Sequence, residues 1–190
     1  MQDNLLARIQ NWYKSHCNGD WEHRYGISIG NLDNPGWTIK IDLAETSLEN
    51  LKFERTIDNG TLDWLFIKTK DNVLEASCDP NKLTTVFEIF LDEIIPNYAD
   101  ENFRYNIFIV MKGASANVWR PAKAKMLTED TMEIVEIPAL KYENIKIKNI
   151  KDINFSQEDI TTFTTRYSVG DKVKTELVEM FDGVTLVATE

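Results

Sequence analysis

Residues 25–43, YGISIGNLDNPGWTIKIDL, have the pattern of two β-strands joined by a tight turn. Apolar residues alternate with polar or small ones on both sides of Asp33–Gly36, which is the two-residue period of strands with one buried face. Within DNPG, proline fixes φ and glycine accepts a positive φ. The stretch therefore predicts a β-hairpin that turns at Asp33–Gly36.

A second hairpin is predicted further along the chain. LDWLFIKT (62–69) and VLEASC (73–78) have strand-like composition and are joined by the turn residues KDN. Before the first hairpin, the apolar residues of 2–15 follow a helical period, and CNGD is typical of a helix end.

The second helix is expected over residues 80–95. Asp79 is its expected cap and Pro80 its first residue. Its apolar residues recur at helical spacing without a miss: Leu83, Val86, Phe87, Phe90, Leu91, Ile94 and Ile95. We therefore expect residues 1–98 to form an α+β domain, an antiparallel sheet with two helices.

Residues 106–190 contain short β-rich runs and lack a long helical pattern. VWRPAKAKML (118–127) and YSVGDKVKTE (167–176) resemble elements of small SH3-like β-barrels. We expect a small all-β, barrel-like domain over 106–190, after a polar boundary segment. Its aromatic residues either fill the barrel core or line a peptide-binding groove, namely Trp119, Phe163 and Tyr167.

The chain is acidic, with 31 acidic and 21 basic residues and a net charge of −10. Residues 1–105 alone carry a net charge of −8. Binding to nucleic acid normally needs clustered Lys and Arg, so direct nucleic-acid binding is not expected. The acidity serves either solubility or the attraction of a basic partner.

Two cysteines are too few for a disulfide scaffold, and the N-terminus lacks the pattern of a secretory signal. The sequence also lacks the run of ~18–20 apolar residues that spans a bilayer. We therefore expect a soluble, cytoplasmic protein with free thiols and no membrane partner.

Residues 16–25, HCNGDWEHRY, contain both histidines of the chain and one of its cysteines. These residue types suit zinc, but a second ligand pair is missing and a turn separates His16 from His23. Cys17 lies at a helix C-terminus, where the dipole raises a thiol pKa. A phosphate-binding glycine motif is also missing. We therefore expect no metal, no cofactor and no catalytic cysteine.

Aromatic and acidic residues are interleaved in the first half of the chain. Trp21 lies outside any regular pattern, so we expect it to be a surface anchor, since binding hot spots favour tryptophan. The hypothesis is a partner-binding surface formed by Asp20, Trp21, Glu22, His23 and Asp33. The same residues can instead be structural, with Asp33 and Asn34 satisfying the turn and Glu22 and His23 pairing. A third interpretation is a small hydrolase that uses Asp20, Glu22 and His23.

Residues 12–46, WYKSHCNGDWEHRYGISIGNLDNPGWTIKIDLAET, closely resemble the immunity protein 53 family of bacterial polymorphic-toxin systems. The matching residues are Trp12, Tyr13, Cys17, Gly19, Asp20, Trp21, Glu22, His23, Tyr25, Gly26, Leu32, Asp33, Asn34, Pro35, Gly36, Trp37, Ile41, Asp42, Leu43 and Thr46. Asn31 stands where threonine is usual. The resemblance implies a cytoplasmic antidote, not an enzyme, that binds and neutralises a cognate toxin. A basic toxin, such as a nuclease, is the partner we expect.

Overall fold

The computed structural model describes residues 4–112, 118–128, 130–139, 146–147, 164–180 and 183–189. The chain forms two compact units. One comprises Met1–Tyr13 and Trp21–Phe103, and the other Lys14–Asp20 and Arg104–Glu190. The expected domain limits, 1–98 and 106–190, stay a prediction.

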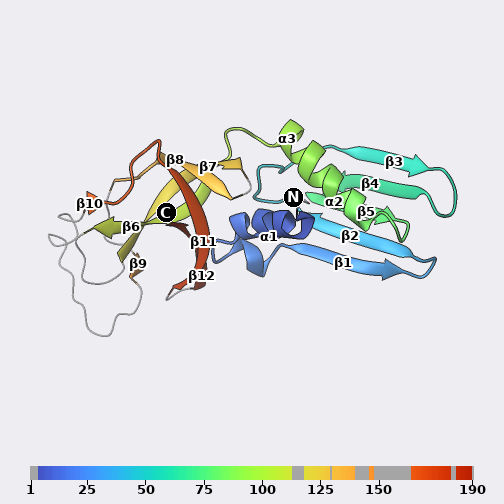
Figure 1. The fold of residues 1–190 in the computed structure, drawn as a ribbon, viewed down its shortest axis with the longest axis horizontal. Coiled ribbons are helices and arrows are strands. Elements are labelled where there is room, and N and C mark those ends of the chain that lie inside the picture. The colour runs from blue at the N-terminus through green and yellow to red at the C-terminus, as the bar shows by residue number, and fades with distance from the viewer. Residues whose placement is uncertain are drawn as a thin grey trace. The chain divides into compact units, whose positions relative to one another are not determined.

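The first unit contains a five-stranded antiparallel sheet in the order β1-β2-β5-β4-β3 (Figure 1). Both predicted hairpins are present. The strands are β1 (Ile27–Leu32), β2 (Gly36–Asp42), β3 (Glu54–Asp58), β4 (Trp64–Lys70) and β5 (Val73–Cys78). The sequence did not predict β3, since ERTID is short and mostly polar.

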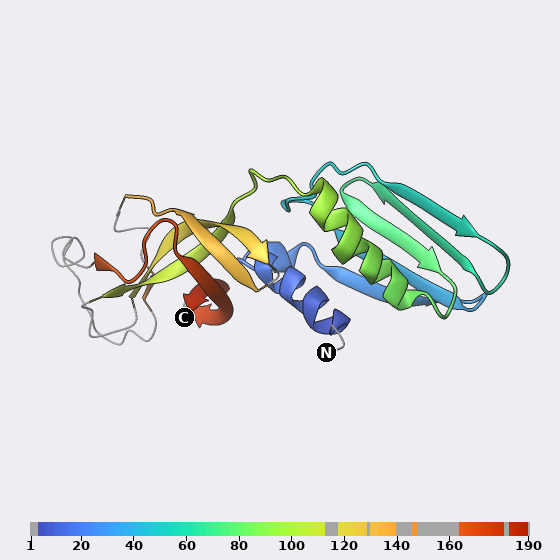
Figure 2. The same ribbon diagram turned by 45° about the horizontal axis from the view of Figure 1, so that its top comes forward.

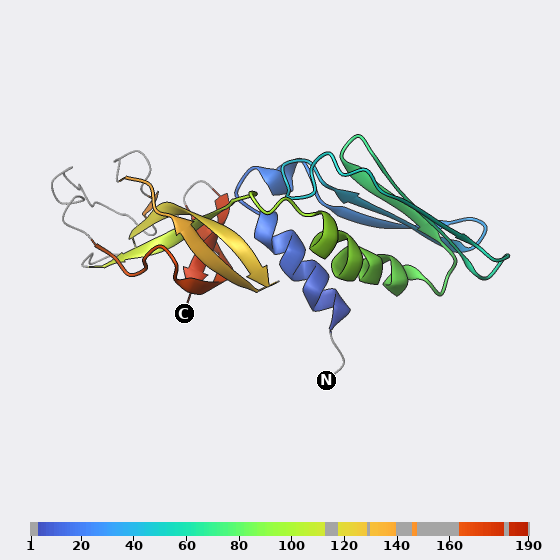
Figure 3. The ribbon, with the colours of Figure 1, turned by 90° about the horizontal axis from the view of Figure 1, so that it is seen from above.

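Helices pack on one face of this sheet (Figure 3). They are α1 (Leu5–His16), α2 (Leu83–Glu88), the π-helical η2 (Ile89–Ile94) and α3 (Ile95–Tyr98); a 3₁₀ turn, η1 (Trp21–His23), follows α1. The first unit therefore has the predicted α+β fold. The wider π turn of η2 precedes Pro96. Proline has no backbone N–H to donate, and its ring would clash with the preceding turn of a regular α-helix.

The second helix begins at Leu83, so the prediction that Asp79 caps it and Pro80 starts it is wrong. The buried Asp79 carboxylate accepts hydrogen bonds from the backbone N–H groups of Asn81 (2.8 Å) and Trp64 (3.1 Å). Asp79 therefore connects this turn to the start of β4, and the helix begins after the turn.

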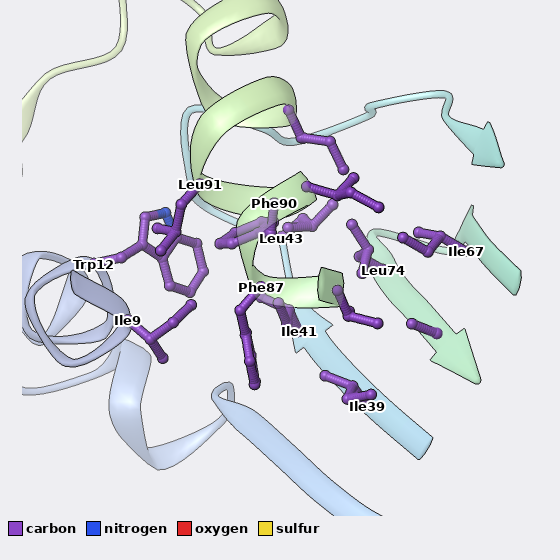
Figure 4. Packing of buried hydrophobic residues seen from close by; sticks show 14 of the residues in the cluster. Ile9, Trp12, Ile39, Ile41, Leu43, Ile67, Leu74, Phe87, Phe90 and Leu91 are labelled. Atoms are coloured by element: carbon purple, nitrogen blue, oxygen red, sulfur yellow. The ribbon is translucent and has the colours of Figure 1, made fainter. Parts of the chain in front are cut away.

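The core lies between the helices and the inner face of the sheet (Figure 4). Alternate strand residues such as Ile39, Ile41 and Leu74 are fully buried there. Trp12 of α1 packs edge-on against Phe90 of η2, with ring centroids 5.0 Å apart. Each fully buried side chain of this size contributes about 1.5–3 kcal/mol to folding.

Among residues 104–190 of the second unit, the helices and strands that the structure describes are all β-strands, as predicted. Five of its strands form a closed ring through the pairings β6–β7, β7–β8, β8–β11, β11–β12 and β12–β6. They are β6 (Tyr105–Lys112), β7 (Val118–Thr128), β8 (Thr131–Glu136), β11 (Lys172–Met180) and β12 (Gly183–Thr189). Two short strands add to this ring: β9 (Lys146–Ile147) pairs with β7, and β10 (Thr164–Thr165) pairs with β6. The colours of Figure 2 follow this chain order.

The aromatic residues predicted for the barrel have different outcomes. Trp119 is buried and packs with Met180 and Val187, as the core interpretation expects. Tyr167 is half-buried. Phe163 lies outside the described residues, and the likeness to an SH3 barrel stays a prediction. In the described part of the chain, helices are too short or too polar to cross a membrane.

Candidate partner-binding site

The predicted binding residues lie in two separate segments of the chain. Trp21, Glu22 and His23 form η1, while Asp33 lies in the β1–β2 turn. The six residues of β1 separate them, which is roughly 20 Å of extended chain. Asp33 and His23 are exposed and Glu22 is half-buried. Asp20 is exposed and belongs to the second unit.

Trp21 is buried, with 1% of its surface exposed, so the prediction of an exposed anchor is wrong. Its indole packs against the rings of Trp12, Tyr13 and Tyr25, with centroids 5.8–6.2 Å away. Its Nε1–H donates to the backbone oxygen of Ala44 at 2.9 Å. A residue without sequence periodicity can still complete a core, because its burial depends on long-range packing.

The segments that carry the family resemblance hold one another in place. Gly26 N–H donates to the Asp42 carboxylate at 2.8 Å, and Asp42 N–H donates to the Gly26 oxygen at 3.0 Å. Arg24 forms an ion pair with Glu45 at 3.0 Å. This part of the motif therefore has a structural role. The binding role of Glu22 and His23 stays a prediction.

In the described part of the chain, the potential metal ligands are dispersed and the thiols are buried. Among them, His, Cys, Asp and Glu do not gather in any group of three or more that suits a metal ion. Both cysteines are buried. Burial raises the pKa of Cys78 to about 11, with the charge of Asp79 acting in the same direction.

The β1–β2 and β3–β4 turns lie at the same end of the sheet (Figure 1). Residues of both turns and of β4 line a surface pocket there. We call this pocket the distal cup; it has a volume of about 360 Å³ and is lined by Asn34, Asp58, Gly60, Thr61, Trp64 and Phe66. The rings of Trp64 and Phe66 lie 5.8 Å apart at 37°. Phe66 remains 42% exposed, although its neighbours Leu65 and Ile67 are buried.

Trp64 is held firmly in the cup. A Cβ atom added to Gly36 would lie 3.0 Å from the Trp64 ring, so the indole occupies the space beside that glycine. The backbone N–H of Trp64 donates to the Asp79 carboxylate, which also pairs with Lys82 at 3.1 Å. Burial raises the pKa of Asp79, but hydrogen bonds from Asn81, Lys82 and Trp64 outweigh it and leave that pKa below its ordinary value.

The acids around the cup differ in their pairing. Lys82 binds Asp63 at 2.6 Å, and this hydrogen bond, together with one from Asn59, lowers the pKa of Asp63. Asp33 and Asp58 are exposed, and no described cation lies within ion-pair distance of either carboxylate. Asp33 and Asp58 are therefore the acids at this end of the sheet that lack an ion-pair partner among the described residues.

A second depression, of about 1030 Å³, lies between α1, α2 and the edge strand β1. Most of its lining is apolar, including Leu5, Ile9, Tyr25, Ile27 and Phe87. Leu6 and Ile29 also line it and are 68% and 51% exposed. It is an apolar groove.

The sequence patterns did not predict the cup. The signal was present in WLFIK, where apolar residues occupy both faces of one strand. Leu65 and Ile67 take the buried face, so Trp64 and Phe66 must lie on the opposite one. That face carries polar residues on the neighbouring strands, such as Lys40 and Glu75.

Residues 6–94 match the family model described as immunity protein 53, which confirms the resemblance predicted for the N-terminal half. Most of this range lies in the first unit. Comparisons with curated proteins and with solved structures found no match.

Proposed function

We propose that this protein is an immunity protein that binds a cognate toxin in the cytoplasm and blocks it. The match of residues 6–94 to immunity protein 53 carries the proposal. This match favours a binding protein over an enzyme. Neutralisation then requires only that the bound protein covers the working surface of the toxin.

The charge distribution supports a basic partner. The first unit holds 17 acidic and 8 basic residues, a net charge of −9, whereas the second has a net charge of −1. The negative potential of the first unit attracts a basic surface and raises the rate of encounter. A toxin domain that acts on nucleic acid is a partner of this kind, because such proteins carry basic patches.

The exposed surfaces of the first unit are suited to protein contact. The distal cup offers aromatic side chains beside unpaired carboxylates, and interface hot spots favour aromatic residues. Asp33 borders Asn34 of the cup, so it remains our proposed contact. Asp20, Glu22 and His23 remain proposed contacts as well. Trp21 is no longer one of them, because its side chain is buried.

Coexpression with candidate toxins tests the proposal. The candidates are the toxin domains encoded by open reading frames adjacent to this gene. We expect one of them to arrest growth, this protein to restore it, and the pair to elute together from a sizing column. Failure to rescue growth and to form a complex with every candidate would contradict the proposal. Turnover of ester or phosphoester substrates by the isolated protein would instead favour the hydrolase.

A further inference from the structure

We propose that the distal cup receives an arginine side chain of the partner, stacked on Trp64 and Phe66 and paired with Asp58. This inference rests on the proposed function and adds where the toxin is held and by what chemistry. The cup is formed by two hairpin turns that lie apart in the sequence and meet at one end of the sheet.

The aromatic walls favour a planar cation. Trp64 and Phe66 alternate along β4 and therefore share its outer face. Guanidinium groups stack on aromatic rings through cation–π attraction, with tryptophan the best acceptor. The large exposed fraction of Phe66 leaves apolar surface that such a side chain can cover.

The polar groups of the cup match the donors of arginine. Asp58 lies directly opposite Trp64 in the β3–β4 register, so its carboxylate stands beside the indole on the same face. A guanidinium can donate two parallel hydrogen bonds to that carboxylate. Asn34, from the other turn, also lines the pocket, and its side-chain amide can supply a further acceptor.

The cup is pre-organised for its ligand. Lys82 pairs with both Asp63 and Asp79, whereas Asp58 and Asp33 have no ion-pair partner among the described residues, so the Asp58 carboxylate is available to a ligand. The contact with Gly36 restricts the Trp64 indole, and the backbone hydrogen bond to Asp79 holds the start of β4. A restricted site loses less entropy on binding, which favours affinity.

The net charge of the first unit indicates what occupies the cup. A second copy of this chain would place two surfaces of net charge −9 against each other, which is unfavourable. A basic partner surface reverses the sign of that interaction. The occupant we infer is therefore an arginine on a basic toxin domain.

The first test uses a peptide and needs no toxin. The full-length, ¹⁵N-labelled protein is titrated with acetyl-Gly-Gly-Arg-Gly-Gly-amide and with the same peptide containing citrulline, a neutral isostere of arginine. We expect saturable shifts of the Trp64 indole N–H and of residues 58–66 with the arginine peptide only. Asp58→Asn should weaken this binding about fivefold or more, and Glu49→Gln, an exposed acid outside the cup, should not change it. Equal shifts with citrulline, or binding that Asp58→Asn leaves unchanged, would overturn the proposal.

The second test uses the toxin that the protection experiment identifies. Asp58→Lys and Phe66→Ser should each raise the Kd of the complex about tenfold or more, whereas Glu49→Lys should change it less than about threefold. Circular dichroism confirms that each variant is folded. If the wild type binds the toxin and both cup variants bind as tightly, the cup inference is wrong and the proposed function stands. If no toxin binds the wild type, the proposed function fails and the peptide titration alone decides the cup.

Discussion

The indole of Trp64 lies against Gly36, so closely that a Cβ atom on Gly36 would be 3.0 Å from the ring and 2.5 Å from the backbone oxygen of Cys78. Gly36 is the last residue of the DNPG turn and the first of β2. Trp64 begins β4, on the far side of β5. This one contact therefore connects the first hairpin to the distal cup.

Replacing Gly36 by alanine should destabilise the protein by about 1–3 kcal/mol or more, because the added methyl group meets rigid backbone. Urea unfolding followed by tryptophan fluorescence measures the change. Gly26→Ala is the matched control, since its Cβ would lie 3.8 Å from the Tyr13 ring, an ordinary contact. Similar losses for the two variants would show that the Gly36 contact is not the cause.

Trp21→Phe should cost about 0.5–1.5 kcal/mol, because it removes the hydrogen bond to Ala44 and keeps most of the packing. Trp21→Ala should cost about 3–5 kcal/mol through the loss of a buried ring. Chemical denaturation measures both values. Folded Trp21→Phe should bind the toxin like the wild type, and a large loss of affinity without a loss of stability would assign Trp21 to the interface after all.

Asp79 should make stability depend on acid pH. The pKa of Asp79 in the folded protein lies below its ordinary value of 3.8. The ionised carboxylate therefore contributes fully to the free energy of unfolding above about pH 3.8, and this contribution is lost as the pH falls further. Asp79→Asn removes this carboxylate and one partner of Lys82, which should lower the midpoint of thermal unfolding at pH 7. The gap between wild type and variant should narrow between pH 5 and pH 3, in scans at stepped pH. A gap that stays constant over this range would contradict the assignment.

The two thiols should be unreactive in the folded protein. Cys17 and Cys78 are buried, and burial raises the pKa of Cys78 to about 11. Since the thiolate is the reactive form, roughly one molecule in a thousand carries it at Cys78 at pH 8. Titration with a chromogenic disulfide should detect two thiols in urea and fewer than about 0.2 within minutes under native conditions. Rapid labelling of one thiol in the native state would refute this prediction.

Association with a basic toxin should slow as salt rises. The net charge of −9 on the first unit acts over a distance that shrinks from about 14 Å at 50 mM salt to about 4 Å at 500 mM. We expect the association rate constant to fall about tenfold or more over this range, and the dissociation rate constant to change far less, by stopped-flow fluorescence. An association rate constant that does not change with salt concentration would contradict the electrostatic part of the proposed function.

Several elements of the fold were predictable because their causes are local. Asp71 and Asn72 adopt the positive φ that their turn requires, and Asn and Asp tolerate it. The turn at Asp33–Gly36 forms as predicted, but Gly36 does not take the positive φ expected of it. The alternation along β2 and β5 and the helical spacing after Leu83 also lie within single segments. The family resemblance was recognisable for the same reason, since its motif is contiguous.

The tertiary structure alone decided which motif residues remain accessible. Trp21 is buried because Trp12, Tyr13 and Tyr25 surround it, a packing that has no periodic pattern in the sequence. The helix starts at Leu83 because the Asp79 carboxylate accepts a hydrogen bond from the Trp64 backbone N–H instead of capping the helix. The distal cup exists because the strand order β1-β2-β5-β4-β3 brings two distant turns to one end of the sheet. Local sequence determined the strands and helices, while long-range pairing determined which side chains they bury and which they present.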